Sequence, residues 1–189
     1  MHGSDQLTLL DGGMGQTLRK RSQSPASPLW SAQVMMDEPG LVVAAHRDFI
    51  AAGADIITTN NYVVTPQRLA RDGDPGWFKS LHKAALQAAH QAASESDRPI
   101  RIAGCLPPLV ASYHSDLVPD DATCRRDYAR LVEAQADGVD LYIAETMSLT
   151  REAVAATRAG KQSGLPVWIA LTVDDHNGAQ LRSDRKSVV

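Results

Sequence analysis

Long apolar runs are absent from this sequence, and none is long enough to cross a bilayer. The first residues also lack the basic segment and the apolar segment that make up a signal peptide. The two cysteines, Cys105 and Cys124, form neither a CxxC pair nor a disulfide-rich pattern, which is typical of a reducing compartment. From these absences we expect a cytoplasmic protein without a membrane partner.

The sequence also lacks an excess of basic residues. The formal net charge is -3 at pH 7, and no basic stripe with interleaved aromatic residues appears. Nucleic-acid binders usually carry a basic patch, so we expect no nucleic acid among the partners. The histidines and cysteines show no zinc-like spacing, so the sequence predicts no metal site built from these residues alone.

What is present is a regular alternation of apolar runs with segments of helical spacing. The apolar runs predict strands at residues 7–10, 54–60, 99–104, 139–144 and 167–173. The segments between them predict helices near residues 14–21, 39–53, 77–94, 120–138 and 150–164. Strands that are mostly continuous apolar runs and alternate with helices predict a parallel sheet buried on both faces.

Two architectures with such a sheet fit the pattern, a doubly wound sheet and a (β/α)₈ barrel. The first turn, Gly12 to Gly15, lacks the G-x-G-x-x-G spacing of dinucleotide-binding sheets. The 189 residues are fewer than the roughly 250 of a typical barrel. In both architectures the site lies at the carboxyl ends of the strands. The residues expected there are Asp11, Asn60, Tyr62, Cys105, Glu145 and Thr172.

The polar residues at these strand ends allow several kinds of chemistry. Asp11 and Glu145 at one rim could bind an ammonium group or perform acid–base catalysis, and the sequence leaves both uses open. Singly, Asp11 could cap the following helix and Glu145 could face water. Asn60 and Tyr62 could hydrogen-bond a ligand, or could serve a turn and packing. Cys105 could be a nucleophile, but without a histidine near it in sequence a small buried residue is the commoner case.

Five motifs carry a family resemblance, and they occur in the family's order along nearly the whole chain. They are Leu10–Gly15, Pro28–Ser31, Ala52–Tyr62, Ala103–Pro108 and Glu145–Met147. Together they resemble the N-terminal part of the homocysteine S-methyltransferases. The resemblance implies an α/β fold of the (β/α)₈ TIM-barrel family, here truncated to about the first five β/α units. It also implies a zinc ion that holds the homocysteine thiolate, which attacks the methyl group of a donor to form methionine.

The same resemblance assigns substrate binding to Asp11, Gly12, Gly13, Asn60, Tyr62, Glu145 and Thr146. In the family's pattern the two acids hold the ammonium group of homocysteine and the glycine backbone lies against the substrate. The Asn and Tyr positions line the pocket. The first choice of methyl donor is S-methylmethionine, because the segments at residues 105–108 and 112–113 look most like the stand-alone members that use it. Betaine and corrinoid- or folate-linked donors stay open.

The chain departs from the family pattern in the residues that bind the metal. The family's zinc ligands are three cysteines, and neither Cys105 nor Cys124 matches them, so no catalytic or metal-binding residue is carried over. Residues 1–183 are expected to form an incomplete barrel with the homocysteine-binding half, and residues 184–189 a non-native tail. We therefore expect no methyl transfer by this chain itself. Two alternatives remain: a metal-independent (β/α)-barrel enzyme that uses Asp11 and Glu145, or a non-catalytic amino-acid-binding module.

Overall fold

The computed structural model describes residues 7–25 and 27–182, so the tail expected at residues 184–189 lies outside the described residues. The helices of this part are α1 (Met14–Arg21), α2 (Trp30–Asp37), α3 (Pro39–Ala51), α4 (Pro66–Asp72), α5 (Phe78–Ser94), α6 (Asp121–Glu133) and α7 (Thr150–Gln162). Its strands are β1 (Ile56–Thr58), β2 (Arg101–Leu106), β3 (Leu141–Met147) and β4 (Val167–Leu171). No helix among these residues is long and apolar enough to span a membrane.

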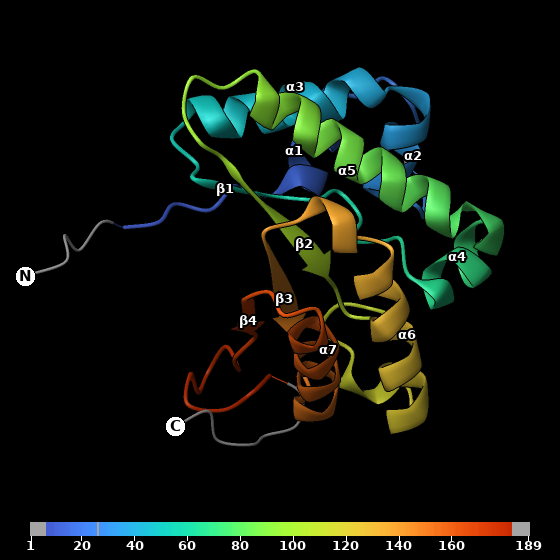
Figure 1. Cartoon of the computed structure of the whole chain (residues 1–189). Coiled ribbons are helices and arrows are strands. Elements are labelled where there is room, and N and C mark those ends of the chain that lie inside the picture. The colour runs from blue at the N-terminus through green and yellow to red at the C-terminus, as the bar shows by residue number, and fades with distance from the viewer. Residues whose placement is uncertain (1–6, 26, 183–189) are drawn as a thin grey trace, which may run out of the picture.

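The strands form one parallel sheet in the order β1-β2-β3-β4 (Figure 1). Helix α5 connects β1 to β2, α6 connects β2 to β3, and α7 connects β3 to β4. Strands that add in chain order on the same side are typical of a (β/α) barrel, whereas a doubly wound sheet reverses its order at a switch point. The predicted α/β fold is therefore confirmed as an open part of a barrel-type sheet, and all carboxyl ends meet at one edge.

The main core lies between this sheet and the helices. Helices α5 and α6 contact β2, while α7 contacts β3 and β4. The largest fully buried side chains include Tyr128 of α6 and Tyr142 of β3. The Tyr142 hydroxyl donates to the carbonyl of Val132 at 3.1 Å, which satisfies its polar atom inside the core. Strand β2 is buried from Ile102 to Leu106, as predicted for a central strand covered on both sides.

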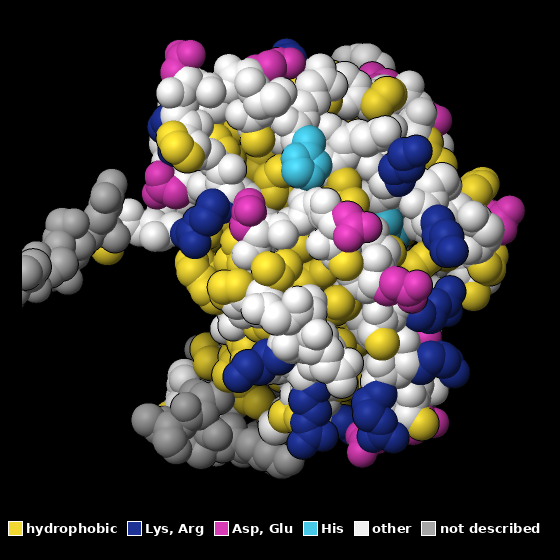
Figure 2. Space-filling view, viewed as in Figure 1, with side chains coloured by type: hydrophobic (Ala, Val, Ile, Leu, Met, Phe, Trp, Pro, Cys, Tyr) yellow, Lys and Arg dark blue, Asp and Glu magenta, His cyan; other side chains and the backbone are white. Residues whose placement is uncertain are grey.

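The sheet edges differ from the prediction. The expected buried strand at residues 7–10 is wrong, because the structure reduces it to one parallel bridge between Leu10 and Ile56 and leaves Leu7 91% exposed. Apolar side chains of β4 are also exposed: Trp168, Ile169 and Leu171. Each of these segments pairs with a strand on one side only, and no strand of the described residues pairs with its other side. Figure 2 shows hydrophobic side chains exposed over the region of the sheet.

Helices α2 and α4 are absent from the sequence prediction, which assigns no helix or strand to their residues. The start of α4 carries an ordinary signal, since the Thr65 hydroxyl accepts the backbone N–H of Arg68 and Pro66 occupies the first turn. Helix α2 begins at Trp30, whose φ of 47° is rare for a bulky residue, and no side chain caps it. The start of α4 could therefore have been predicted from the sequence, whereas the start of α2 could not.

Candidate functional site

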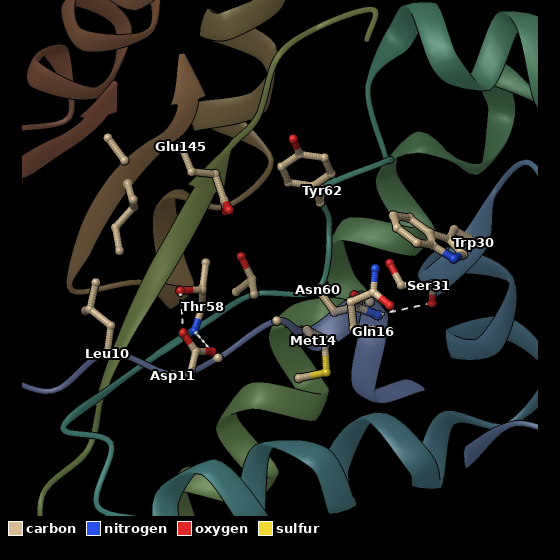
Figure 3. A pocket seen from close by; sticks show the side chains of 16 residues that line it. Leu10, Asp11, Met14, Gln16, Trp30, Ser31, Thr58, Asn60, Tyr62 and Glu145 are labelled. Atoms are coloured by element: carbon tan, nitrogen blue, oxygen red, sulfur yellow. Dashed lines mark hydrogen bonds between the residues drawn. The ribbon is translucent and has the colours of Figure 1, made fainter. Parts of the chain in front are cut away.

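A pocket of about 500 Å³ lies at the carboxyl ends of the strands (Figure 3). It brings together six of the seven residues assigned to substrate binding, namely Asp11, Gly12, Gly13, Asn60, Tyr62 and Glu145. The seventh, Thr146, follows Glu145 in the chain but does not line the pocket. Further lining residues include Met14, Gln16, Trp30, Ser31 and Thr58. In Figure 3 the two acids lie on one side of the pocket, and the rings of Tyr62 and Trp30 lie on the other.

Asp11 is fixed to the end of β1. Its carboxylate accepts the backbone N–H of Thr58 at 2.7 Å and the Thr58 hydroxyl at 3.0 Å. The N-cap of α1 is Gly13 without a side-chain cap bond, so the reading of Asp11 as a helix cap is wrong. Burial raises the pKa of Asp11 to about 6, because desolvation outweighs the hydrogen bonds from Thr58.

Glu145 projects from β3 just before an irregularity in that strand. Ile143 and Glu145 both line the pocket, as alternate residues of one strand face. The register with β4 then shifts between Ala144 and Met147, and Thr146 takes a φ of 61°, an outlier for a β-branched residue. The bulge ends the alternation, so Met147 enters the helix-side core instead of the pocket.

The two carboxylates affect each other. Burial raises the pKa of Glu145, the thiol of Cys105 lowers it, and the negative charge of Asp11 raises it again. Among residues 7–25 and 27–182, no Lys, Arg or His forms an ion pair with either acid. The pocket therefore has two desolvated acids and lacks a described positive charge to balance them.

The wall of the pocket opposite the two acids includes Asn60 and Tyr62, which come after β1 in the chain. The Asn60 amide donates to the carbonyl of Ser31 at 3.2 Å and so ties this wall to α2. The Tyr62 hydroxyl shares a 2.6 Å hydrogen bond with Ser112, and the Arg68 guanidinium lies 5.4 Å from the centre of the Tyr62 ring. Burial raises the pKa of Tyr62, so its hydroxyl stays protonated at neutral pH. This wall offers an aromatic face and a hydroxyl to a ligand.

Two further candidates from the sequence lie beside the pocket. Cys105 is fully buried, and its Sγ donates to Glu145 Oε1 at 2.9 Å. Burial and the neighbouring Glu145 hold the pKa of this thiol well above its ordinary value, which favours the reading of Cys105 as a small buried residue over that of a nucleophile. Thr172 shares a 2.7 Å hydrogen bond with Ser148 and closes the end of β4 on β3 instead of lining the pocket.

Thr58 is a site residue that was not among those predicted from the sequence. Its backbone and hydroxyl both hold Asp11 in place. Thr58 stands two residues before Asn60 in the same apolar run, and alternate residues of a strand share a face. The period of two was therefore the signal that could have placed Thr58 beside the site.

The described residues do not fit a zinc site. No group of three His, Cys, Asp or Glu side chains within them is arranged to hold a metal ion. A soft zinc site needs thiolates or imidazoles. The thiol of Cys105 is bound to Glu145, and burial raises the pKa of Cys124, which lies on α6, to about 11. Both thiols thus keep their protons in the metal-free protein, and a metal ion would have to displace them in order to bind.

A barrel-type sheet with acids, an amide and a phenol gathered at its carboxyl rim is typical of (β/α)-barrel proteins, whose sites lie at that rim. A family model described as homocysteine S-methyltransferase matches residues 8–188. The chain belongs to this family.

Individual relatives agree with this assignment. The chain is 28% identical to the selenocysteine methyltransferase of Astragalus bisulcatus, over 94% of its own length and 62% of that protein. It is 28% identical to betaine–homocysteine S-methyltransferase 1 of Sus scrofa, over 90% of its own length and 61% of that protein. The metallated form of the homocysteine methyltransferase MmuM from Escherichia coli superposes with a TM-score of 0.83 at 27% identity, covering 97% of this chain and 68% of that one. The chain thus spans about three fifths of the length of these curated relatives.

Proposed function

We propose that this protein is a homocysteine S-methyltransferase, and that the described residues form the part that binds the amino acid end of homocysteine. One observation carries the proposal: Asp11 and Glu145 are both desolvated, both line the same pocket, and have no described cation beside them. An ammonium group between the two carboxylates supplies the missing charge and forms charge-assisted hydrogen bonds. It favours the ionised form of both acids and so offsets the cost of burying them.

The glycines beside Asp11 support a substrate that lies close to the backbone. A Cβ built on Gly12 would lie 2.8 Å from Cε1 of Phe49, so any larger residue here would have to displace this ring. Gly13 and Gly15 also line the pocket without side chains. The chain of a small amino acid is therefore proposed to run along this bare backbone, with its ammonium group at the acids.

The methyl donor is proposed to be S-methylmethionine or a related sulfonium. The support lies on the opposite wall, where the rings of Trp30 and Tyr62 line the pocket. A positively charged methyl carrier binds well against aromatic faces. The named relatives include methyltransferases for selenocysteine and for betaine with homocysteine, so the family accommodates more than one substrate pair.

Activation of the thiol is the remaining requirement. In the family a bound zinc ion favours the thiolate of homocysteine, which is the nucleophilic form. The described residues do not fit such an ion, and burial keeps Cys105 protonated. We therefore propose that a polypeptide of these 189 residues binds homocysteine without transferring a methyl group.

The test uses the purified 189-residue chain. Isothermal titration calorimetry with L-homocysteine measures binding, and chromatography measures methionine formed from homocysteine and S-methylmethionine. The expected result is binding without methionine, and loss of binding in Glu145→Gln. Absence of binding in the wild-type chain would contradict the proposal. Methionine that forms in the presence of a chelator would favour a metal-independent enzyme instead.

A further inference from the structure

Among residues 7–25 and 27–182, Cys105 is the one titratable side chain with a hydrogen bond to Glu145, and the proposed function gives it no task. The register pairs Cys105 of β2 with Ile143 of β3, so Glu145 is its diagonal neighbour on the same face. The Cys105 Sγ lies 2.9 Å from Glu145 Oε1. Because burial holds the pKa of this thiol well above its ordinary value, the sulfur keeps its proton and acts as the donor.

The backbone of Cys105 is itself held by three side chains. Its N–H donates to the Thr59 hydroxyl at 3.1 Å. Its carbonyl accepts from the amides of Asn61 at 3.1 Å and of Gln135 at 3.2 Å. All three side chains are buried, and Thr59 also hydrogen-bonds to both Asn61 and Gln135. Fully satisfied buried networks of this kind fix a unique geometry. The network therefore holds the sulfur at a set place beneath the carboxylate.

We propose that Cys105 is a positioning residue, whose thiol proton holds the Glu145 carboxylate in the orientation that receives the ammonium group of homocysteine. The inference rests on the proposed function, because it assumes that the pocket binds this amino acid. Glu145 also faces the negative charge of Asp11, and both acids are desolvated. A donor at Oε1 stabilises the ionised carboxylate against both effects. It leaves the other oxygen of Glu145 for the ligand.

Loss of the thiol has two expected consequences. Without the donor the pKa of Glu145 rises, since desolvation and Asp11 both favour the neutral form. The carboxylate is also free to rotate away from the ammonium position. Serine at the same place keeps a donor, whereas alanine removes it. The pair Cys105→Ser and Cys105→Ala therefore separates donation from simple packing.

The experiment measures two properties of each variant. The pH midpoint of Glu145 in the free protein is followed by NMR of its ¹³C-labelled carboxyl group. The affinity for L-homocysteine is measured by calorimetry at pH 7.5. In Cys105→Ala we expect a raised midpoint and binding weakened by about tenfold. Cys105→Ser should stay near wild type in both. Cys124→Ala is the matched control, because this second buried cysteine donates to the Pro119 carbonyl away from the pocket.

The two measurements separate failure of the inference from failure of the proposed function. An unchanged Glu145 midpoint in Cys105→Ala overturns the inference alone. A wild-type chain that does not bind homocysteine overturns the proposed function, and with it the task given to Cys105. Equal weakening in Cys105→Ala and Cys105→Ser also overturns the inference, because packing would then explain the effect. If Cys105→Ala does not fold, Cys105→Val fills the space without a donor and takes its place.

Discussion

Replacing Asp11 with Asn is expected to make the free protein more stable at neutral pH while removing its affinity for homocysteine. Burial raises the pKa of Asp11 from 3.8 to about 6. The folded form therefore binds this proton more tightly than the unfolded chain does. The stability that protonated Asp11 provides is complete below pH 3.8 and is lost as the pH rises through about 6.

The size of the effect follows from that shift. A change of about 2 pKa units corresponds to about 3 kcal/mol at any pH above both values. Asn cannot ionise, so it avoids this cost. It keeps one oxygen for Thr58 and loses the second hydrogen bond, which costs about 1 kcal/mol at every pH. Asp11→Asn should thus be about 2 kcal/mol more stable than wild type at pH 7.5 and slightly less stable at pH 4.

Urea denaturation followed by circular dichroism at both pH values measures this difference. His46 and His82 titrate in the same window, since burial lowers the pKa of each to about 4. Their contribution is common to both proteins and cancels in the difference between variant and wild type. A difference in unfolding free energy that is the same at pH 4 and pH 7.5 would refute the claim that Asp11 is ionised at a cost. Calorimetry on the same variant should detect no homocysteine binding.

Two other substitutions test the packing around the site and within the helices. Gly12→Ala places a methyl group against Phe49 and should lower the unfolding free energy by about 1–3 kcal/mol in urea denaturation, whereas Gly40→Ala, with open space around it, should not destabilise. His46→Leu removes two buried ring nitrogens that have no hydrogen-bond partner. It should raise the melting temperature more at pH 5 than at pH 7, because wild type loses stability as the pH falls from 6.5 towards about 4. An equal gain at both pH values would contradict the assigned pKa of His46.

Local patterns were sufficient to predict most of the fold. The helical spacing at residues 77–94 becomes α5 (Phe78–Ser94), and residues 14–21 become α1. The run at residues 99–104 becomes β2, displaced by two residues (Arg101–Leu106). These elements follow from periodicity, which a single sequence contains. The exposure of the edge segment at residues 7–10 could not be predicted in this way. Burial depends on which strands lie beside a segment, and the periodicity of one segment does not contain that information.

The sequence was sufficient to predict which residues form the site, but not how their side chains contact one another. Asp11 and Glu145 could be placed at one rim because parallel strands share an edge. The contact of Asp11 with Thr58 depends on pairing between segments 47 residues apart. The contact of Cys105 with Glu145 depends on the register of β2 with β3. The bulge at Thr146, which brings Met147 into the core, depends on the register of β3 with β4. Register and packing are properties of the whole fold, so local sequence does not specify them.

Asp11 and Glu145 are proposed to bind one ammonium group between them. The most direct test compares the affinity of the wild-type chain for L-homocysteine and for mercaptobutyrate, which is homocysteine without its amino group. If the two acids bind the ammonium group, homocysteine binds at least about tenfold more tightly, and the double variant Asp11→Asn, Glu145→Gln loses this preference. Equal affinity of the wild-type chain for both ligands would contradict this role of the two acids.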